Sequence, residues 1–467
     1  MCSREFRVHP VINGHMRWNN GRMDVFRIGS GAGYSGDRID PARDLAERGH
    51  LNALVFECLA ERTIALAQLR RSQDPDAGFD PLLEERMRAV LPACVAQGTT
   101  VITNMGAANP EGAGQTVIRV ARALGLPRLR VAVVSGDDVL SWMQANDVPL
   151  MDSDQTVRCL DGRLVSANVY LGADALLPAL RAQADVVVTG RVADPALFLA
   201  PLMHHFGWAA DDWPRLGQGI VAGHLLECAA QVSGGYIADP GFVDVPRLDE
   251  VGFPLAEVQA DGRFVLTKLP GTGGRVDRLT CTAQLLYELE DPARYLQPDV
   301  VADFSGVRLT EVGPDRVQVD GGGGSPRPDQ FKVSLGYRDG FIGEGQISYA
   351  GPGARARGEL ALAILERRLQ RLGLDAQEHR AELIGVNAMH GPERGQDCEP
   401  YEVRVRLAAR APSRAAAERI GQEVEALYLN GPAGGGGVTM STREVIAVAS
   451  ALMPREAVRP HCRILEL

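Results

Sequence analysis

The chain has 467 residues, of which 45% are hydrophobic and 23% are charged. This composition excludes a disordered, collagen-like or coiled-coil chain as a description of the whole, and the length predicts two or three domains. The formal net charge of −10 argues against nucleic acid or an anionic membrane as a partner, because both favour a basic surface. No apolar run reaches the roughly 18 residues of a membrane span.

The eight cysteines include no C-x-x-C pair. This spacing is typical of reduced thiols in a cytoplasmic protein rather than of a disulfide framework or a zinc ribbon. Residues 1–23 contain no apolar core of a secretory signal. We expect them to form a leader that is either disordered or mis-annotated, with Met23 as the true start in the second case.

From residue 25 to about residue 190, short apolar runs alternate with longer helical patterns. Runs that are apolar on both faces predict buried parallel strands, joined by right-handed helical crossovers. The expected strands are 25–28, 51–56, 100–103, 129–134 and 185–189. The expected helices are 40–48, with Asp40 as N-cap, then 59–71, 81–97, 115–124, 138–145, 173–183, 195–205 and 220–232. The first half is therefore expected to be an α/β domain with a mostly parallel sheet.

After residue 234 the hydrophobic pattern changes, and it predicts strands with period-two alternation mixed with amphipathic helices. Strands are expected at 307–312, 316–319, 331–337, 346–349 and 401–407, and helices at 275–290, 358–372 and 413–429. We therefore predict a parallel α/β domain over 24–240 and a mixed α+β domain over 241–467.

Polar segments follow each of the five expected strands of the first half. They are residues 29–38, 57–62, 104–110, 135–138 and 190–195, all rich in Gly, Asp, Asn or Arg. In an open parallel sheet, ligands bind beyond the carboxyl ends of the strands. The five segments are therefore expected to meet at one edge and to form a single site.

The first of these segments holds a G-x-G-x-x-G pattern at Gly31, Gly33 and Gly36, and Glu57 lies 21 residues further on. This arrangement resembles a dinucleotide fingerprint. However, residues 37–40 separate the last glycine from the helix that should follow it directly. A nicotinamide or flavin site, a loop whose amides hold a phosphate or carboxylate, and a plain turn all stay open.

Charged residues at two other strand ends suggest acid–base chemistry. Burial would raise the pKa of Glu57 and make it a general base, but it could also cap the next helix and pair with Arg62. Asp194, followed by a proline, could be a base or a helix N-cap. The sequence indicates no structural role for Arg191. An arginine at this position can bind a carboxylate or phosphate with two hydrogen bonds.

No metal site is expected. Asp137 and Asp138 could hold a divalent cation, but Asp137 is also a natural cap for the next helix. His224 and Glu227 face one another on one helix turn as H-x-x-E, which is not the H-E-x-x-H zinc pattern.

Four segments carry a resemblance to a known family: RIGSGAGYSGDR (27–38), LVFECLAERT (54–63), TNMGAANP (103–110) and VTGRVADP (188–195). Together they resemble the acyclic terpene utilisation protein A (AtuA) family, over about residues 24–467. The resemblance implies a bacterial, cytoplasmic catabolic protein that works beside carboxylases and acyl-CoA enzymes in the breakdown of citronellol and geraniol. Some members carry an additional C-terminal module, so a separate small subunit that supplies it is a candidate partner.

We therefore expect a lyase, hydratase or dehydratase that acts on a carboxylate or an acyl-CoA. Glu57 is the first candidate for the base, Asp194 the second, and Asn104 would orient the substrate. The expected substrate-binding residues are Gly31, Gly33, Ser35, Gly36, Asp37, Arg38, Arg62, Gly106, Asn109, Asp138 and Arg191.

Two alternatives remain. One is an NAD- or flavin-dependent oxidoreductase, and the other is a non-catalytic subunit that binds an acyl ligand or assembles with a partner. The sequence requires no cofactor, although CoA can be part of the substrate. A homo-oligomer is expected on general grounds.

Overall fold

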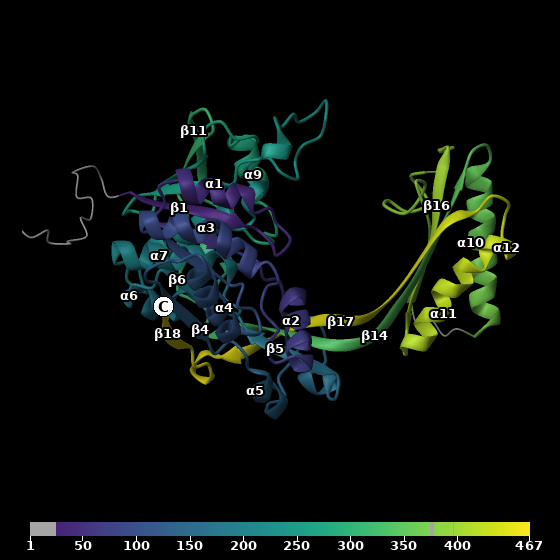
Figure 1. The fold of residues 1–467 in the computed structure, drawn as a ribbon, viewed down its shortest axis with the longest axis horizontal. Helices are drawn as coiled ribbons and strands as arrows, with labels where there is room; N and C mark the ends of the chain where they lie inside the picture. Colours follow the sequence, from purple (N-terminus) through teal and green to yellow (C-terminus); the bar gives the residue numbers. More distant parts are fainter. Residues whose placement is uncertain (1–24, 374–377, 396) are drawn as a thin grey trace, which may run out of the picture.

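The computed structural model describes residues 25–373, 378–395 and 397–467. The expected leader, 1–23, lies outside the described residues. A body built on one large sheet carries a smaller module on two long strands (Figure 1).

The ten-stranded sheet of the body has the order β11-β12-β8-β7-β1-β2-β3-β6-β4-β18. Its central strands are all parallel to one another, which confirms the predicted α/β class. They are β1 (Phe26–Ala32), β2 (Ala53–Phe56), β3 (Thr100–Thr103), β6 (Val186–Thr189) and β4 (Arg130–Ser135). All five overlap strands expected from apolar runs, with one correction: β1 was expected to end at residue 28 but continues to Ala32, so residues 29–32 belong to the strand and not to the segment that follows it.

Antiparallel strands extend this sheet on both sides. They are β7 (Pro254–Val258), β8 (Phe264–Lys268), β12 (Arg316–Asp320) and β11 (Arg308–Gly313) beside β1, and β18 (His461–Glu466) beside β4. The division near residue 240 stays a prediction, and the sheet is continuous across it because β7 pairs directly with β1.

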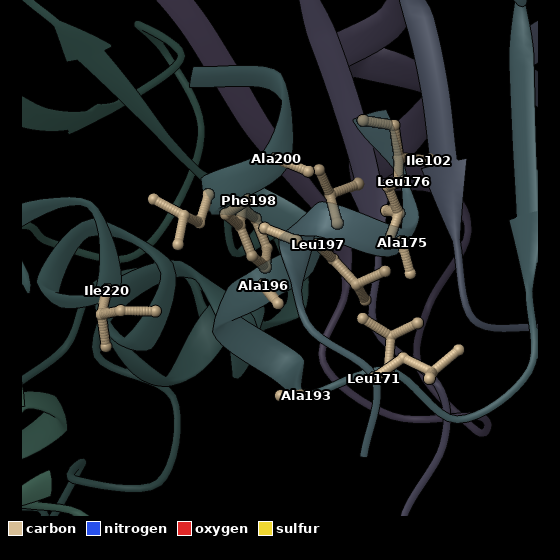
Figure 2. Packing of buried hydrophobic residues seen from close by; sticks show 14 of the residues in the cluster. Ile102, Leu171, Ala175, Leu176, Ala193, Ala196, Leu197, Phe198, Ala200 and Ile220 are labelled. Atoms are coloured by element: carbon tan, nitrogen blue, oxygen red, sulfur yellow. The ribbon is translucent and has the colours of Figure 1, made fainter. Parts of the chain in front are cut away.

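Alternate residues of the central strands enter two different cores. In β2, Leu54 packs on one face and Val55 on the other. The first face is covered by α1 (Asp40–Arg48), α3 (Leu83–Gln97) and α4 (Pro110–Ala123). The opposite face is covered by α6 (Leu177–Arg181), α7 (Asp194–Phe206) and α8 (Trp213–Glu227). Figure 2 shows this second layer, where Leu197 and Phe198 of α7 lie among Ile102, Leu176 and Ile220.

The outer module extends from the body on β14 (Gln330–Ala350) and β17 (Gly436–Pro454), which pair along most of their length (Figure 1). The expected separate strands 331–337 and 346–349 are one continuous strand, which is a correction. At the body end β14 also pairs with β5 (Leu164–Val169), a strand that the sequence did not predict. The module itself adds α10 (Ala354–Arg371), β15 (Glu378–Ile384), β16 (Glu402–Ala411), α11 (Arg414–Glu425) and α12 (Leu427–Asn430).

The remaining elements complete the body. They are α2 (Glu61–Gln73), α5 (Leu140–Ala145), α9 (Arg278–Leu285), β9 (Tyr295–Leu296), β10 (Val301–Asp303) and β13 (Gly323–Ser325). One predicted cap is wrong: Asp40 is the first residue of α1, and the N-cap position is Ile39, without a side-chain hydrogen bond. Among the described residues, no helix combines the length and apolar character needed to cross a membrane.

Close packing of α11 on β14 makes Gly343 sensitive to substitution. A Cβ at Gly343 would lie 1.8 Å from the carbonyl oxygen of Ala417, a backbone atom that cannot turn away. We therefore expect Gly343→Ala to lower the free energy of unfolding by about 1–3 kcal/mol, measured by urea titration. Gly436→Ala, in the neighbouring strand β17, is the control because its Cβ would meet nothing within 4 Å. Equal stability of the two variants would contradict this packing.

Candidate functional site

The carboxyl ends of the five parallel strands lie at one edge of the sheet, because all five strands run in the same direction. At the neighbouring strands β3 and β6, the chain leaves toward opposite faces: β3 leads to α4 on one side, and β6 leads to α7 on the other. Such a reversal opens a crevice in an α/β sheet and is a common place for ligand sites. Asn104 and Arg191 begin the two diverging segments.

Glu57 is a buried carboxyl group at the end of β2, with 8% of its surface exposed. Its Oε1 accepts hydrogen bonds from the Leu59 amide at 2.8 Å and from Asn104 Nδ2 at 2.9 Å. The Asn104 Oδ1 accepts from the Cys58 amide at 2.8 Å, which fixes the direction of the Asn104 side chain. Asn104 therefore orients Glu57.

Burial raises the pKa of Glu57, and the positive charge of Arg191 and the two hydrogen bonds offset only part of this effect. The alternative in which Glu57 caps the next helix is not what the structure shows. The helix α2 begins later, at Glu61, and its N-cap Ala60 makes no side-chain hydrogen bond. The Arg62 side chain is exposed.

Arg191 is almost fully buried, with 1% exposed, and is held by protein groups. Its guanidinium donates to the carbonyl oxygens of Leu59 and Val192 and to the Asp194 carboxylate. It also lies over the Tyr170 ring, with 4.6 Å between the guanidinium carbon and the ring centroid. Four of the five N–H donors of an arginine are thereby used. Arg191 therefore supplies fixed positive charge to the site rather than a free two-pronged clamp.

Asp194 is the first residue of α7, and Ala193 occupies the N-cap position without a side-chain hydrogen bond. Of the two alternatives for Asp194, the N-cap is therefore wrong, and a role as base stays a prediction. Its carboxylate is instead the ion-pair partner of Arg191, and 37% of its side chain is exposed. This pairing places Asp194 at the outer side of the buried Arg191.

Asp137 locks the turn that presents Arg191. Its Oδ2 accepts from the Arg191 amide and from Asn168 Nδ2, both at 2.8 Å. A Cβ at Gly190 would lie 2.3 Å from Asp137 Oδ1, so only glycine fits at that position. The suggested role of Asp137 as a cap of the next helix is wrong: the N-cap of α5 is Val139, which makes no side-chain hydrogen bond, and the Leu140 amide donates to Asp138 Oδ1. Burial is the main cause that raises the pKa of Asp137 to about 6.

Arg86, a fully buried arginine that we did not predict to belong to the site, shapes the glycine-rich loop after β1, residues 33–38. Its Nη2 donates to the carbonyl oxygens of Tyr34, Ser35 and Asp37. In a trans peptide the carbonyl and the following N–H point in opposite directions. The amides of Ser35 and Gly36 are therefore turned away from Arg86, and neither donates to a protein group in the described part of the chain.

Asp37 closes the same loop from within. Its carboxylate accepts from the amides of Gly33 at 3.0 Å and Arg38 at 2.8 Å. A small hollow is lined by Ser35, Cys58 and Asn104, among others. Of these residues, Cys58 directly follows Glu57 in the chain. The loop and the Glu57–Asn104 pair thus share one edge.

A second polar group, which we did not predict to lie near the site, is found where α8 ends. His224 Nδ1 is 2.8 Å from Glu227 Oε1, and both residues are buried. The following residue, Cys228, packs against the glycine-rich loop: a Cβ at Gly33 would lie 2.5 Å from the Cys228 carbonyl carbon. The signal in the sequence is the H-x-x-E spacing, which places the two side chains on one helix turn.

The structure does not bring every expected binding residue to this place. Arg38 donates to the carbonyl oxygens of Leu248 and Asp249. Asn109 caps α4 by accepting from the Gly112 amide. Gly106, in contrast, does lie at this edge, because a Cβ there would be 2.4 Å from the carbonyl oxygen of Thr189, the last residue of β6.

Asp138 is exposed, and Gln68 Nε2 donates to it at 3.3 Å. The roles of all these residues as ligands stay predictions. Within the described ranges, no three His, Cys, Asp or Glu side chains are grouped so that they could hold a metal ion.

The family model for the acyclic terpene utilisation protein AtuA matches residues 26–464, nearly the whole chain. The chain belongs to the AtuA family. No curated protein and no solved structure matches it. The match spans both the sheet edge described above and the outer module.

Removal of the Asp137 charge should change how stability depends on pH. Because the folded-state pKa is raised from 3.8 to about 6, the folded protein binds more protons than the unfolded chain between these values. Stability from this group is therefore lost as pH rises through that window. Relative to the parent, Asp137→Asn should gain up to roughly 3 kcal/mol between about pH 4 and pH 7, measured by urea unfolding at each pH. A difference that does not vary with pH would contradict the burial of a titrating carboxyl there.

Proposed function

We propose that this AtuA-family protein is a lyase, hydratase or dehydratase that acts on an acyclic terpenoid carboxylate or its CoA thioester, with Glu57 as general base. The observation that carries the proposal is the buried Glu57 carboxyl, oriented by Asn104 at the strand edge where the chain reverses direction. A carboxyl with a raised pKa is a better proton acceptor once it is ionised, and the nearby Arg191 keeps an ionised fraction accessible.

The glycine-rich loop supports the anionic half of this proposal. Because Arg86 holds the carbonyl groups inward, the Ser35 and Gly36 amides point outward as a pair of donors. Such paired amides can stabilise the negative charge that develops on a carbonyl oxygen when an adjacent carbon loses a proton. A thioester or carboxylate oxygen at the loop would place its α-carbon toward the neighbouring strand end, where Glu57 lies.

The dinucleotide alternative has less support. In a dinucleotide site the central glycine lets the pyrophosphate approach the backbone closely. Here the corresponding Gly33 is covered by the backbone of Cys228. The acidic residue of the pattern, Glu57, is buried against Asn104 instead of facing outward toward a ribose.

The third hypothesis is a non-catalytic subunit that binds an acyl ligand or assembles with a partner. It predicts that the protein alone shows no turnover and that it co-purifies stably with a second chain. We place the protein in the cytoplasm, with small-molecule substrates and as a homo-oligomer. A separate small subunit that supplies the additional C-terminal module of some members is a further proposed partner.

Substitution Glu57→Gln tests the assignment. The glutamine Oε1 can still accept from Leu59 and Asn104, so the fold should be preserved while proton abstraction is lost. With the acids derived from citronellol and geraniol and their CoA thioesters as probes, we expect turnover, measured by mass spectrometry, to fall by about 10²- to 10⁴-fold. Incorporation of deuterium from D₂O into the probe should fall in parallel.

Glu84→Gln is the control for removal of a carboxylate, because the Glu84 side chain is 45% exposed and pairs with the surface residue Arg88. Turnover by Glu57→Gln that equals that of the control would overturn the base assignment. Probe binding without turnover in any variant, including the parent, would favour the non-catalytic reading.

A further inference from the structure

Strand β17 has one edge that is open over most of its length. It is the last strand in the order β15-β16-β14-β17, and β14 pairs with its other edge along the arm between the body and the outer module (Figure 1). At the body end of the open edge, the Met151 amide donates to the Ser450 carbonyl oxygen at 2.8 Å. At the module end, the Val438 amide donates to the Tyr428 hydroxyl at 3.3 Å. The chain's own groups therefore close this edge at its two ends only.

Between these two contacts, the backbone groups of every second residue point outward. Alternate residues of an antiparallel strand direct both their N–H and their C=O groups to the same side, so the outward carbonyl of Ser450 identifies which residues these are. Within the described ranges, no group of the chain pairs with their outward N–H and C=O groups. The row of unpaired groups is roughly 25 Å long. It belongs to Met440, Thr442, Glu444, Ile446 and Val448.

The side chains of this edge do not protect it from a further strand. Exposed edges of natural sheets are usually blunted by lysine, proline or an inward-pointing charge. Residues 440–448, with the sequence MSTREVIAV, contain neither lysine nor proline. Their charged residues are Arg443 and Glu444, and Glu444 already pairs with Arg338 of β14. Another strand can therefore add to this edge through main-chain hydrogen bonds.

We propose that the open edge of β17 is the interface with a second copy of this chain, whose β17 pairs with it antiparallel about a twofold axis. Such a contact uses the same strand twice and closes the edge on both copies at once. The inference rests on the homo-oligomer proposed above, to which it assigns a surface. It does not depend on the reaction at Glu57.

Charge restricts the register of this pair. About a twofold axis perpendicular to the sheet, one residue of β17 lies opposite itself. If that residue were Arg443 or Glu444, two like charges would lie directly opposite one another, which destabilises a strand pair. If it is Val445, valine lies opposite valine, and neither charged residue faces its own kind.

The supply of unpaired backbone groups favours the same register. With Val445 at the centre, Thr442 pairs with the partner's Val448 and Glu444 pairs with the partner's Ile446, so that Met440 alone of the outward residues stays unpaired. A centre at Thr442 or at Ile446 would leave two outward residues against positions that are already occupied or lie beyond the edge. The pair centred on Val445 therefore satisfies the most hydrogen-bonding groups.

This register also joins two apolar surfaces that the single chain leaves exposed. At the module end, Tyr428 and Leu429 of α12 and Met440 of β17 are exposed, and Leu429 has 95% of its surface in solvent. Tyr428 lies at the edge itself, because its hydroxyl binds the Val438 amide. These three side chains form the apolar tip of the module.

The second apolar surface lies at the body end of the same edge. A groove of about 520 Å³ there is lined by Trp142, Met151 and Leu452, among others. Met151 is 52% exposed. Centred on Val445, the pair sets Met440 opposite the partner's Ser450, beside the partner's Met151. The apolar tip of each module would thus lie at the groove of the other copy, and this match was not used to choose the register.

The substitution Thr442→Pro tests the surface. Proline lacks the outward N–H, which β14 does not use, so the strand should be kept while each copy loses a donor to the other. We expect the dissociation constant of the dimer, measured by sedimentation velocity, to rise about 10- to 100-fold. Thr442→Ala is the control because it keeps the amide, and it should dimerise as the parent does. Circular dichroism of both variants checks that they fold.

A cross-link tests the register. The two copies of Val445 form a pair that is not hydrogen-bonded, with Cα atoms about 4.5 Å apart, a separation that a disulfide spans. In a chain whose exposed Cys159 and Cys398 are replaced by serine, Val445→Cys should therefore give a covalent dimer on mild oxidation, seen by non-reducing electrophoresis. Val448→Cys in the same chain is the control, because its two copies would be roughly 20 Å apart and should stay uncoupled.

The outcomes separate this inference from the proposals on which it builds. A parent that is monomeric at every concentration would remove both the surface and the homo-oligomer. A parent dimer that withstands Thr442→Pro, with no cross-link through Val445→Cys, would remove the surface and leave the homo-oligomer. If Thr442→Pro does not fold, the comparison of Val445→Cys with Val448→Cys decides. Turnover is not measured in any of these experiments, so the role of Glu57 is tested separately.

Discussion

The burial of Arg191 beside Glu57 is the constraint on which the arrangement of the site depends. A buried guanidinium without partners is very costly, and here carbonyl groups from Leu59 and Val192 and the Asp194 carboxylate bind it. These partners come from the segment after β2 and from the start of α7. Satisfying one charge therefore ties two strand ends together and leaves Glu57 in a fixed electrostatic field.

Arg86, on the other face of the sheet, is a second buried guanidinium that needs polar partners. Its carbonyl partners all lie in the glycine-rich loop, and an ion pair with Asp80 at 3.6 Å balances its charge. The consequence for function is indirect, because carbonyl groups drawn inward turn the following amides outward. One buried arginine thus determines the field around the carboxyl, and the other determines the direction of the amides, so the site is preorganised from both faces.

The sequence allowed the parallel core to be predicted because each strand there is apolar on both faces and ends in a polar segment. The same reasoning brought Glu57, Asn104 and Arg191 to one edge. It could not assign Arg38 or Asn109 correctly to their partners, because those partners are backbone carbonyl and amide groups that no residue pattern identifies. His224 and Glu227 were visible as a helical pair, but the packing of the next residue, Cys228, against Gly33 depends on tertiary structure, which no local residue pattern predicts.

The outer module is connected to this site through the body end of β14. Lys332, near the start of β14, lies 3.2 Å from Glu61 Oε1, and Tyr170 donates to the same oxygen at 2.5 Å. Burial alone would raise the pKa of Glu61, but the Tyr170 hydrogen bond and the Lys332 charge lower it to about 2. The Tyr170 ring in turn lies against both Lys332 and Arg191. The strand that carries the module is therefore part of the wall around Arg191, and the two parts of the fold are joined by charge as well as by backbone.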